Sequence, residues 1–193
     1  MLGVIIVMFC KKEKVKKVGE VILGFGVLFM GLSLMSGSMA GLKESPFIIS
    51  LLSNLKNPFL GIFIGFLITA IIQSSSVTVS ILLLMAQQGL LPLGICFYII
   101  LGCNIGACTS ALLASLNGNK DAKRAALIHF LFNVIGTVIM AVMLLLGESW
   151  VENMITTLSG GNIGRSVANA HTLFKVFQVL ILSLIHISEP TRH

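Results

Sequence analysis

The sequence predicts an all-α integral membrane protein, a fold class indicated by its composition, its apolar runs and the clustering of its positive charges. Of the 193 residues, 56% are hydrophobic and 10% are charged, whereas a typical soluble domain has roughly 25% charged residues. Such a chain has too few polar side chains to cover a surface that faces water. We therefore expect its outer surface to face a lipid bilayer.

Several apolar runs are candidate membrane helices, and most of them are short. A hydrocarbon core about 30 Å thick needs about 20 helical residues. Only Ala125–Leu146, and with some tolerance Val18–Met35, is long enough to cross alone. The shorter runs are Pro58–Ile72, Val77–Ala86, Leu90–Leu101 and Thr172–Ile187. The sequence therefore predicts broken or re-entrant helices beside the full crossings, of which we expect four or five.

The net charge of +6 lies mainly in two clusters, which indicates topology more than a nucleic-acid partner. Lys11–Lys17 carries five lysines and one acid, and Asn119–Arg124 carries three basic residues and one acid. By the positive-inside rule both clusters are cytoplasmic in a multi-pass protein of the cell membrane. Gly147–Asn153 contains two glutamates and no base, so we expect it on the outer side.

This topology constrains the middle of the chain. If Val18–Met35 leaves the cytoplasm and Asn119–Arg124 is back inside, the intervening chain must cross an odd number of times. Joined across their polar breaks, the apolar pieces from Pro58 to Leu116 would make two crossings, so at least one piece re-enters or Ser45–Asn57 joins a hairpin. Interrupted helices are tolerated in a membrane where protein or a water-filled cavity satisfies the freed backbone groups. They commonly mark a transport site.

The strongest interruption is the polar segment Gln73–Ser76 inside an apolar stretch. Four consecutive residues cover most of the circumference of a helix, so they cannot share one buried face. A single serine often bonds back to the carbonyl four residues earlier. Burying an unpaired hydroxyl costs roughly 2 to 7 kcal/mol, so for four polar residues we favour a helix that opens here toward a ligand.

A stripe of small and polar residues leads into this segment at four-residue spacing. It comprises Gly61, Gly65, Thr69 and Gln73, and it continues through Ser76 and Ser80. Small residues at this spacing allow two membrane helices to pack closely. Ser74, Ser75 and Thr78 fall off the stripe, which again favours an opened helix.

A second polar interruption lies in Leu101–Ser115. Gly102 and Gly106 allow close backbone approach, and Asn104 offers an amide; Asn and Gly favour a break in a helix over its interior. Neither interruption contains a formal charge. Carbonyl and hydroxyl oxygens suit a hard cation such as sodium, while hydroxyl donors and a helix N-terminus suit an oxyanion. A site with both would bind an anion together with neutralising cations.

The segments GFLITAIIQSSSVTVSILLLMA, ILGCNIGACTSALLAS and KRAALIHFLFNVIGT together resemble the second half of the type II sodium-dependent phosphate cotransporters. KVGEVILGFGVLFMGLSLMS resembles the helix that precedes this motif, and the similarity covers roughly Lys16 to Phe177. The resemblance implies one of two inverted repeats, each with a Gln-Ser-Ser-Ser segment. It also implies sodium-coupled phosphate symport rather than enzyme catalysis, with no organic cofactor.

The resemblance also implies the residues of a binding site. The expected phosphate-binding and ion-binding residues are Gln73, Ser74, Ser75, Ser76, Thr78, Asn104, Gly106 and Thr109. Among them Ser75, Ser76 and Asn104 are the candidate sodium ligands. We expect the two interruptions to approach each other near the middle of the membrane, with phosphate, sodium and the lipid bilayer as partners.

Three features depart from the family pattern. The chain has a single Gln-Ser-Ser-Ser segment, so either a missing first repeat or a second copy of the chain is expected to complete the site. Lys175 replaces the asparagine of a recurrent His-Thr-Leu-Phe-Asn pattern. The last residues do not continue the pattern. We expect residues 1–182 to form one membrane domain from a longer reading frame and residues 183–193 to be a non-native tail.

Two other functions were weighed against transport. His129, Asn133 and Thr137 share a helix face, an arrangement that His171, Lys175 and Gln178 repeat. A membrane histidine beside serines could indicate an intramembrane serine hydrolase, but there is no G-x-S-x-G elbow and no acid near His129. We expect His129 to make a packing hydrogen bond between helices. The remaining alternative is an inactive membrane fragment that dimerises through its glycines.

Overall fold

A computed structural model describes residues 2–41, 45–46, 55 and 57–187, with the side chains of 39, 40 and 182–187 left outside the description. The described residues form helices and connecting turns, and no strand occurs among them. The predicted all-α class is therefore confirmed. The chain divides into two compact units, Met1–Glu44 and Ser45–His193. The single domain expected for residues 1–182 stays a prediction, as does the tail, most of which lies outside the described residues.

The first unit is a pair of helices, α1 (Leu2–Phe9) and α2 (Glu13–Ala40). Gly3 lets the two backbones touch, because a Cβ atom there would lie 2.6 Å from the amide nitrogen of Leu23 and 2.8 Å from the carbonyl oxygen of Gly19. The five lysines between positions 11 and 17 are exposed. The turn between the helices and the start of α2 thus present the cationic cluster to its surroundings.

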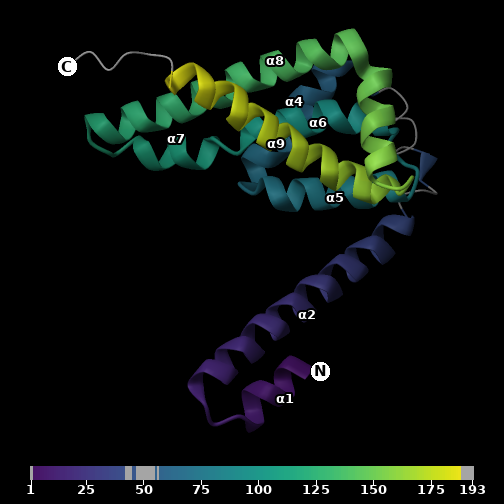
Figure 1. Cartoon of the computed structure of the whole chain (residues 1–193), viewed down its shortest axis with the longest axis vertical. Helices are drawn as coiled ribbons and strands as arrows, with labels where there is room; N and C mark the ends of the chain where they lie inside the picture. The colour runs from purple at the N-terminus through teal and green to yellow at the C-terminus, as the bar shows by residue number, and fades with distance from the viewer. Residues whose placement is uncertain (1, 42–44, 47–54, 56, 188–193) are drawn as a thin grey trace. The chain divides into compact units, whose positions relative to one another are not determined.

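The second unit is a bundle built around one central helix (Figure 1). Its elements are α4 (Pro58–Ile72), α5 (Ser75–Gln87), α6 (Leu93–Gly106), α7 (Thr109–Ser115), α8 (Lys120–Leu158) and α9 (Ile163–Ile187). All residues of α6 except Leu93 and Ile105 are buried, and α4, α5, α8 and α9 all contact this helix. The near-continuous apolar sequence of α6 is typical of a helix with protein on every side.

Glycines bring α4 and α6 into backbone contact. A Cβ atom on Gly65 would lie 2.0 Å from the carbonyl oxygen of Ile99, and one on Gly102 would lie 1.9 Å from that of Ile62. These distances leave no room for any side chain, so glycine is required at both positions. The predicted close-packing role of the glycine stripe is confirmed on α4, where Gly61, Gly65 and Thr69 are buried.

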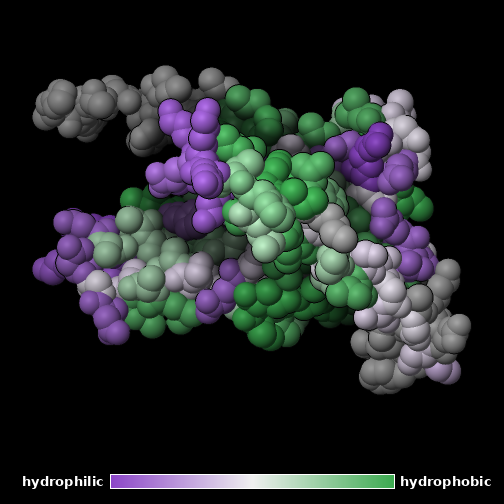
Figure 2. Space-filling model, turned by 90° about the horizontal axis from the view of Figure 1, so that it is seen from below, coloured by the Kyte–Doolittle hydropathy of each residue, from purple (hydrophilic) through white to green (hydrophobic). Residues whose placement is uncertain are grey.

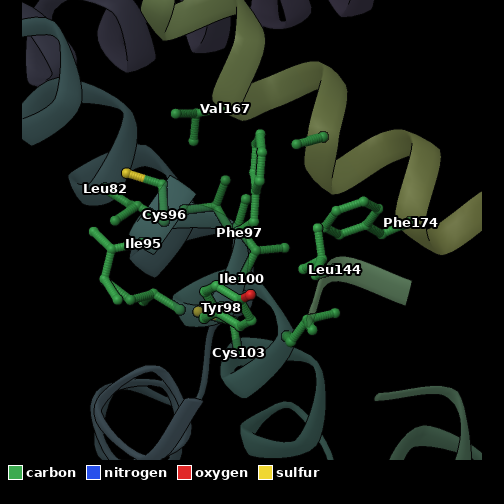
Figure 3. Close-up of a cluster of buried hydrophobic side chains, with 14 of the residues drawn as sticks. Leu82, Ile95, Cys96, Phe97, Tyr98, Ile100, Cys103, Leu144, Val167 and Phe174 are labelled. Atoms are coloured by element: carbon green, nitrogen blue, oxygen red, sulfur yellow. The ribbon is translucent and has the colours of Figure 1, made fainter. Parts of the chain in front are cut away.

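The side chains at the centre of the bundle come from four helices (Figure 3). Phe97 of α6 and Phe174 of α9 meet edge to face with ring centroids 5.9 Å apart. Leu82 from α5 and Leu144 from α8 belong to the same buried cluster. This packing fixes α9 against α6, and so positions the polar residues of α9 that are described below.

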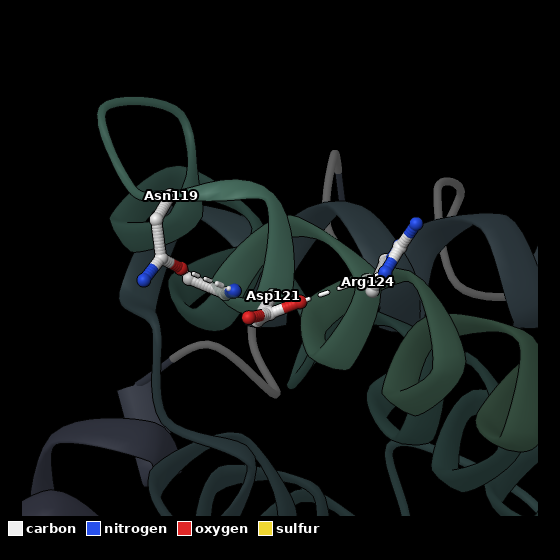
Figure 4. Close-up of polar contacts among 4 residues, drawn as sticks. Asn119, Asp121 and Arg124 are labelled. Carbon is white, nitrogen blue, oxygen red and sulfur yellow. Dashed lines mark hydrogen bonds and ion pairs between the residues drawn. The ribbon is translucent and has the colours of Figure 1, made fainter.

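Helix α8 begins at a capped N-terminus and bends in its C-terminal half. The side chain of Asn119 accepts a hydrogen bond from the amide of Ala122 over 2.8 Å (Figure 4). Asp121 and Arg124 form an exposed ion pair at 3.6 Å in the first turn. The bend lies at Gly147, whose φ of −147° and ψ of 37° are not helical. It falls immediately after the apolar run that ends at Leu146.

The surface of the helices is strongly apolar. Large hydrophobic side chains such as Phe29, Phe63, Val138 and Val179 are exposed, and Figure 2 shows hydrophobic residues gathered over much of one face. Among the described residues three helical stretches are long and apolar enough to cross a membrane, namely Glu13–Ser38, Leu93–Ser115 and Lys120–Leu158. The chain is therefore a multi-pass membrane protein. The expected total of four or five crossings stays a prediction.

Candidate functional site

The helix opens at Gln73 and Ser74, as the sequence predicts. Gln73 takes the left-handed conformation with φ of 57°, and its amide donates to the carbonyl of Thr69 over 2.7 Å, which ends α4. Ser74 is extended, and its hydroxyl accepts a hydrogen bond from the amide of Val77 over 3.4 Å. Each residue therefore satisfies a backbone group at one of the two new helix ends.

The chain turns sharply at this break. The hydroxyl of Thr69 donates to the hydroxyl of Thr78 over 3.1 Å, and Thr78 donates in turn to the carbonyl of Ser74. Both threonines are buried. Because they lie one turn before and one turn after the break, the end of α4 and the start of α5 lie side by side. We call the segment from Thr69 to Thr78 the hairpin tip.

Ser75 and Ser76 occupy the first turn of α5 at the hairpin tip. Ser75 is half-buried, and Ser76 is exposed, as is Gln73. The amides of a helix's first turn have no intrahelical carbonyl to bond, and the helix dipole places partial positive charge there. Together with the serine hydroxyls, these amides can donate hydrogen bonds to an oxyanion, and the hydroxyl oxygens can bind a hard cation.

The second interruption is slighter than the sequence predicts. Asn104 lies within α6, and the break falls at Ala107 and Cys108, which both keep right-handed helical backbone angles. A two-residue defect that retains helical dihedral angles lets α6 and α7 continue in nearly one direction. The break lies within the predicted interruption Leu101–Ser115. Asn104 itself stays helical, because its buried amide finds partners without opening the helix.

The two interruptions meet at Thr69. A Cβ atom on Gly106 would lie 2.7 Å from the Cβ of Thr69 and 2.7 Å from the carbonyl oxygen of Phe66. The hydroxyl of Thr109 donates to the carbonyl of Gly106 over 2.6 Å. Gly106 thus lies against the threonine that bonds to Thr78, so part of the second interruption is brought to the hairpin tip.

Asn104 instead directs its amide toward α8 and α9. Its Nδ2 donates to Oε1 of Gln178 over 2.8 Å and to the hydroxyl of Thr137 over 3.3 Å. Its Oδ1 accepts a hydrogen bond from Nζ of Lys175. The sodium ligand set of Ser75, Ser76 and Asn104 stays a prediction.

A polar network around Asn104 joins three helices. Gln178 donates through Nε2 to the carbonyl of Phe132 over 3.2 Å and to Oδ1 of Asn133 over 3.4 Å. The hydroxyl of Thr137 donates to the carbonyl of Leu101 over 3.3 Å. Lys175 and Gln178 were absent from the expected site. The signal that could have placed them there is their spacing of three to four residues, which puts polar side chains on one face of each of the two later helices.

His129 packs near α7 and not at the hairpin tip. Its carbonyl accepts hydrogen bonds from the Cys108 thiol at 3.8 Å and from Nδ2 of Asn133 at 2.9 Å. Its ring Nε2 lies 4.0 Å from Sγ of Cys108. The neighbour of the ring is therefore the thiol of Cys108.

The described helices thus form an apolar membrane bundle in which an interrupted helix pair packs on a glycine-lined helix and polar side chains are buried inside. Residues 45–148, more than half of the chain, match the family model of the Na+/Pi-cotransporter. The chain belongs to this family. The resemblance read from the Gln-Ser-Ser-Ser and Asn-Ile-Gly segments is thereby confirmed.

Known relatives match this chain over different shares of its length. The uncharacterized protein YqeW of Bacillus subtilis is 27% identical over 203 residues, covering 100% of this chain and 64% of that protein. The sodium-dependent phosphate transport protein 2A of Rattus norvegicus is 33% identical over 127 residues, which cover 61% of this chain and 20% of the rat protein. Protein 2C of Mus musculus is 39% identical over 82 residues, or 40% of this chain and 14% of that protein.

The chain thus spans less than two thirds of the Bacillus protein and a fifth or less of these two mammalian proteins. No solved structure matches the chain.

Proposed function

We propose that this chain forms the binding half of a sodium-coupled phosphate symporter, with phosphate and sodium held at the hairpin tip. The observation that carries the proposal is the chain reversal between Thr69 and Thr78, which leaves the N-terminus of α5 and its serines unburied at the end of a hairpin. Membership of the Na+/Pi-cotransporter family and the similarity to two proteins named as sodium-dependent phosphate transporters support the choice of ions.

Each part of the tip has a role in this proposal. The amides and hydroxyls of Ser75 and Ser76 donate hydrogen bonds to phosphate oxygens, because these donors lie at the positive end of a helix dipole. Serine oxygens also coordinate sodium, which neutralises the anion where the protein offers no charge. Gln73 and Ser74 hold the two helix ends open, and Thr78, Gly106 and Thr109 form the floor of the site.

Phosphate uptake into vesicles tests the proposed function. The purified chain is reconstituted into liposomes, and radiolabelled phosphate is supplied with an inward sodium gradient, with an equal potassium gradient or with neither. We expect uptake with the sodium gradient alone. Uptake that is equal in sodium and potassium would contradict coupling, and a lack of uptake by well-folded chain would support the alternative of an inactive membrane fragment.

The same vesicles can be used to test whether a second copy of the chain completes the site, and which side of the membrane the basic segments face. With one Gln-Ser-Ser-Ser segment per chain, we expect active vesicles to contain a cross-linkable homodimer, unless a separate first repeat must be added to restore uptake. In this proposal Lys11–Lys17 and Asn119–Arg124 face the cytoplasm. Single cysteines introduced in these segments should react with an impermeant maleimide only from the cytoplasmic side of the cell membrane.

A further inference from the structure

Lys175 carries a positive charge into the polar network between α6, α8 and α9. Its Nζ donates a hydrogen bond to Oδ1 of Asn104, which is itself buried. Nδ2 of the same asparagine donates to Gln178 and Thr137. His171 also lines the cavity beside Lys175, and its Nε2 is buried without a hydrogen-bond partner among the described residues. The cavity at the ammonium group is lined by Asn104, Gln178, His171 and apolar side chains, and no acidic residue of the described chain belongs to this lining.

In the part of the chain that the structure describes, Lys175 forms no ion pair, and the ion pair found there joins Asp121 to Arg124 at the surface. A charged side chain within a membrane is costly and ordinarily has a paired charge or a functional role. Neutral oxygens are also the ligands that a hard cation such as sodium accepts. The network therefore provides the surroundings of a cation site, and a lysine occupies it.

The volume of the cavity beside Lys175 indicates whether an anion could bind next to the ammonium group. The cavity next to the ammonium group has a volume of about 10 Å³. A void of that size is at the limit for holding one water molecule, so a phosphate ion does not fit. A dehydrated sodium ion is smaller than a water molecule, so its size is compatible with the position of the ammonium group. Direct anion binding at this position is therefore disfavoured.

We propose that the ammonium group of Lys175 is a tethered cation that occupies a sodium-type site at Asn104. The chain consequently binds one sodium ion fewer than it would with a neutral side chain at this position. The inference rests on the proposed function in one respect, the coupling to sodium, and it takes Asn104 from the candidate sodium ligands of the sequence analysis. It adds that this site holds a tethered ammonium group, whose positive charge contributes to neutralising the anion.

Sodium binding measured without phosphate tests this inference separately from transport. Radioactive sodium is titrated onto the purified chain in detergent, comparing the natural chain with Lys175→Asn and Lys175→Gln. Both changes remove the charge and supply an amide oxygen. We expect each variant to bind one more sodium ion per chain at saturation. Lys123→Asn makes the same change at an exposed position of α8 and should leave sodium binding unchanged.

Equal sodium binding by the natural chain and both folded variants would overturn the inference. So would failure of both variants to fold in sodium-containing buffer, because a site suited to sodium should accept the ion in place of the ammonium group. A different result would contradict the proposed function, namely a lack of sodium-driven phosphate uptake. An extra sodium ion in the variants would stand even then.

Discussion

The side-chain oxygens of Thr69 and Thr78 lie 3.1 Å apart across the break between α4 and α5, although the residues are nine positions apart. A continuous helix would separate them by about 13 Å along its axis. The hydrogen bond therefore closes the hairpin tip at its base. It also ties the tip to Gly106, which packs against Thr69.

Replacing the two threonines by valine should show that they act as a pair. Thr69→Val and Thr78→Val each keep the side-chain shape and remove a hydroxyl, so each should lower the free energy of unfolding by about 1 kcal/mol. The double variant should lose less than the sum, because the shared hydrogen bond is lost only once. The free energy of unfolding is measured in detergent for the two single variants and the double variant. Strictly additive losses would contradict a direct bond.

Alanine at the glycines between α4 and α6 should be strongly destabilising. In Gly65→Ala and Gly102→Ala the new Cβ would overlap a backbone carbonyl oxygen, at 2.0 Å and 1.9 Å. Backbone must then move, so we expect a loss of about 1 to 3 kcal/mol. Thermal unfolding in detergent checks this.

Gly26→Ala on α2 is the matched control, because a Cβ atom there would meet nothing within 4 Å. It should leave the unfolding temperature nearly unchanged or raise it slightly, since alanine favours helix. Equal behaviour of Gly26→Ala and Gly65→Ala would show that the close approach of α4 and α6 is not formed in detergent.

The hairpin tip could be predicted from the sequence because its causes are local. Gln73 and Ser74 end one helix and begin the next with their own backbone and side-chain groups. Four consecutive polar residues in an apolar run are sufficient to indicate that one helix ends there and another begins. The glycine stripe was visible for a similar reason, because spacing along one helix fixes which residues share a face.

The network around Asn104 could not be predicted in the same way. Lys175 and Gln178 lie 71 and 74 positions from Asn104, and nothing in their spacing states which helix faces α6. The sequence indicated a polar face on each of α8 and α9 but not that the two faces converge. It also predicted an interruption in Leu101–Ser115. Helix propensity does not show, however, that Asn104 keeps its helical backbone through hydrogen bonds to Gln178 and Lys175.

Removing the side chain of Asn104 should destabilise the bundle through its partners. In Asn104→Ala, Oε1 of Gln178 and Nζ of Lys175 each lose a hydrogen bond inside the protein. Leaving such groups unbonded costs about 1 to 3 kcal/mol each. We therefore expect a clear fall in unfolding temperature. Asn117→Ala, at an exposed position between α7 and α8, should cause little change.

Alanine substitutions at the serines of the hairpin tip should affect phosphate uptake and protein stability differently. Ser74 caps α5 through its hydroxyl, so Ser74→Ala should lower the free energy of unfolding by about 1 kcal/mol and reduce sodium-dependent phosphate uptake. Ser75→Ala and Ser76→Ala should reduce or abolish uptake while leaving unfolding and membrane insertion unchanged, because these hydroxyls are proposed to bind the ions.

Uptake by reconstituted vesicles and thermal unfolding, measured on the same preparations, check these expectations. Ser33→Ala is the control, an exposed serine of α2 outside the motif, and it should change neither quantity. A triple alanine variant at Ser74, Ser75 and Ser76 that kept full uptake with unaltered sodium dependence would show that the three serines serve helix packing. Phosphate and sodium would then have to bind elsewhere in the bundle.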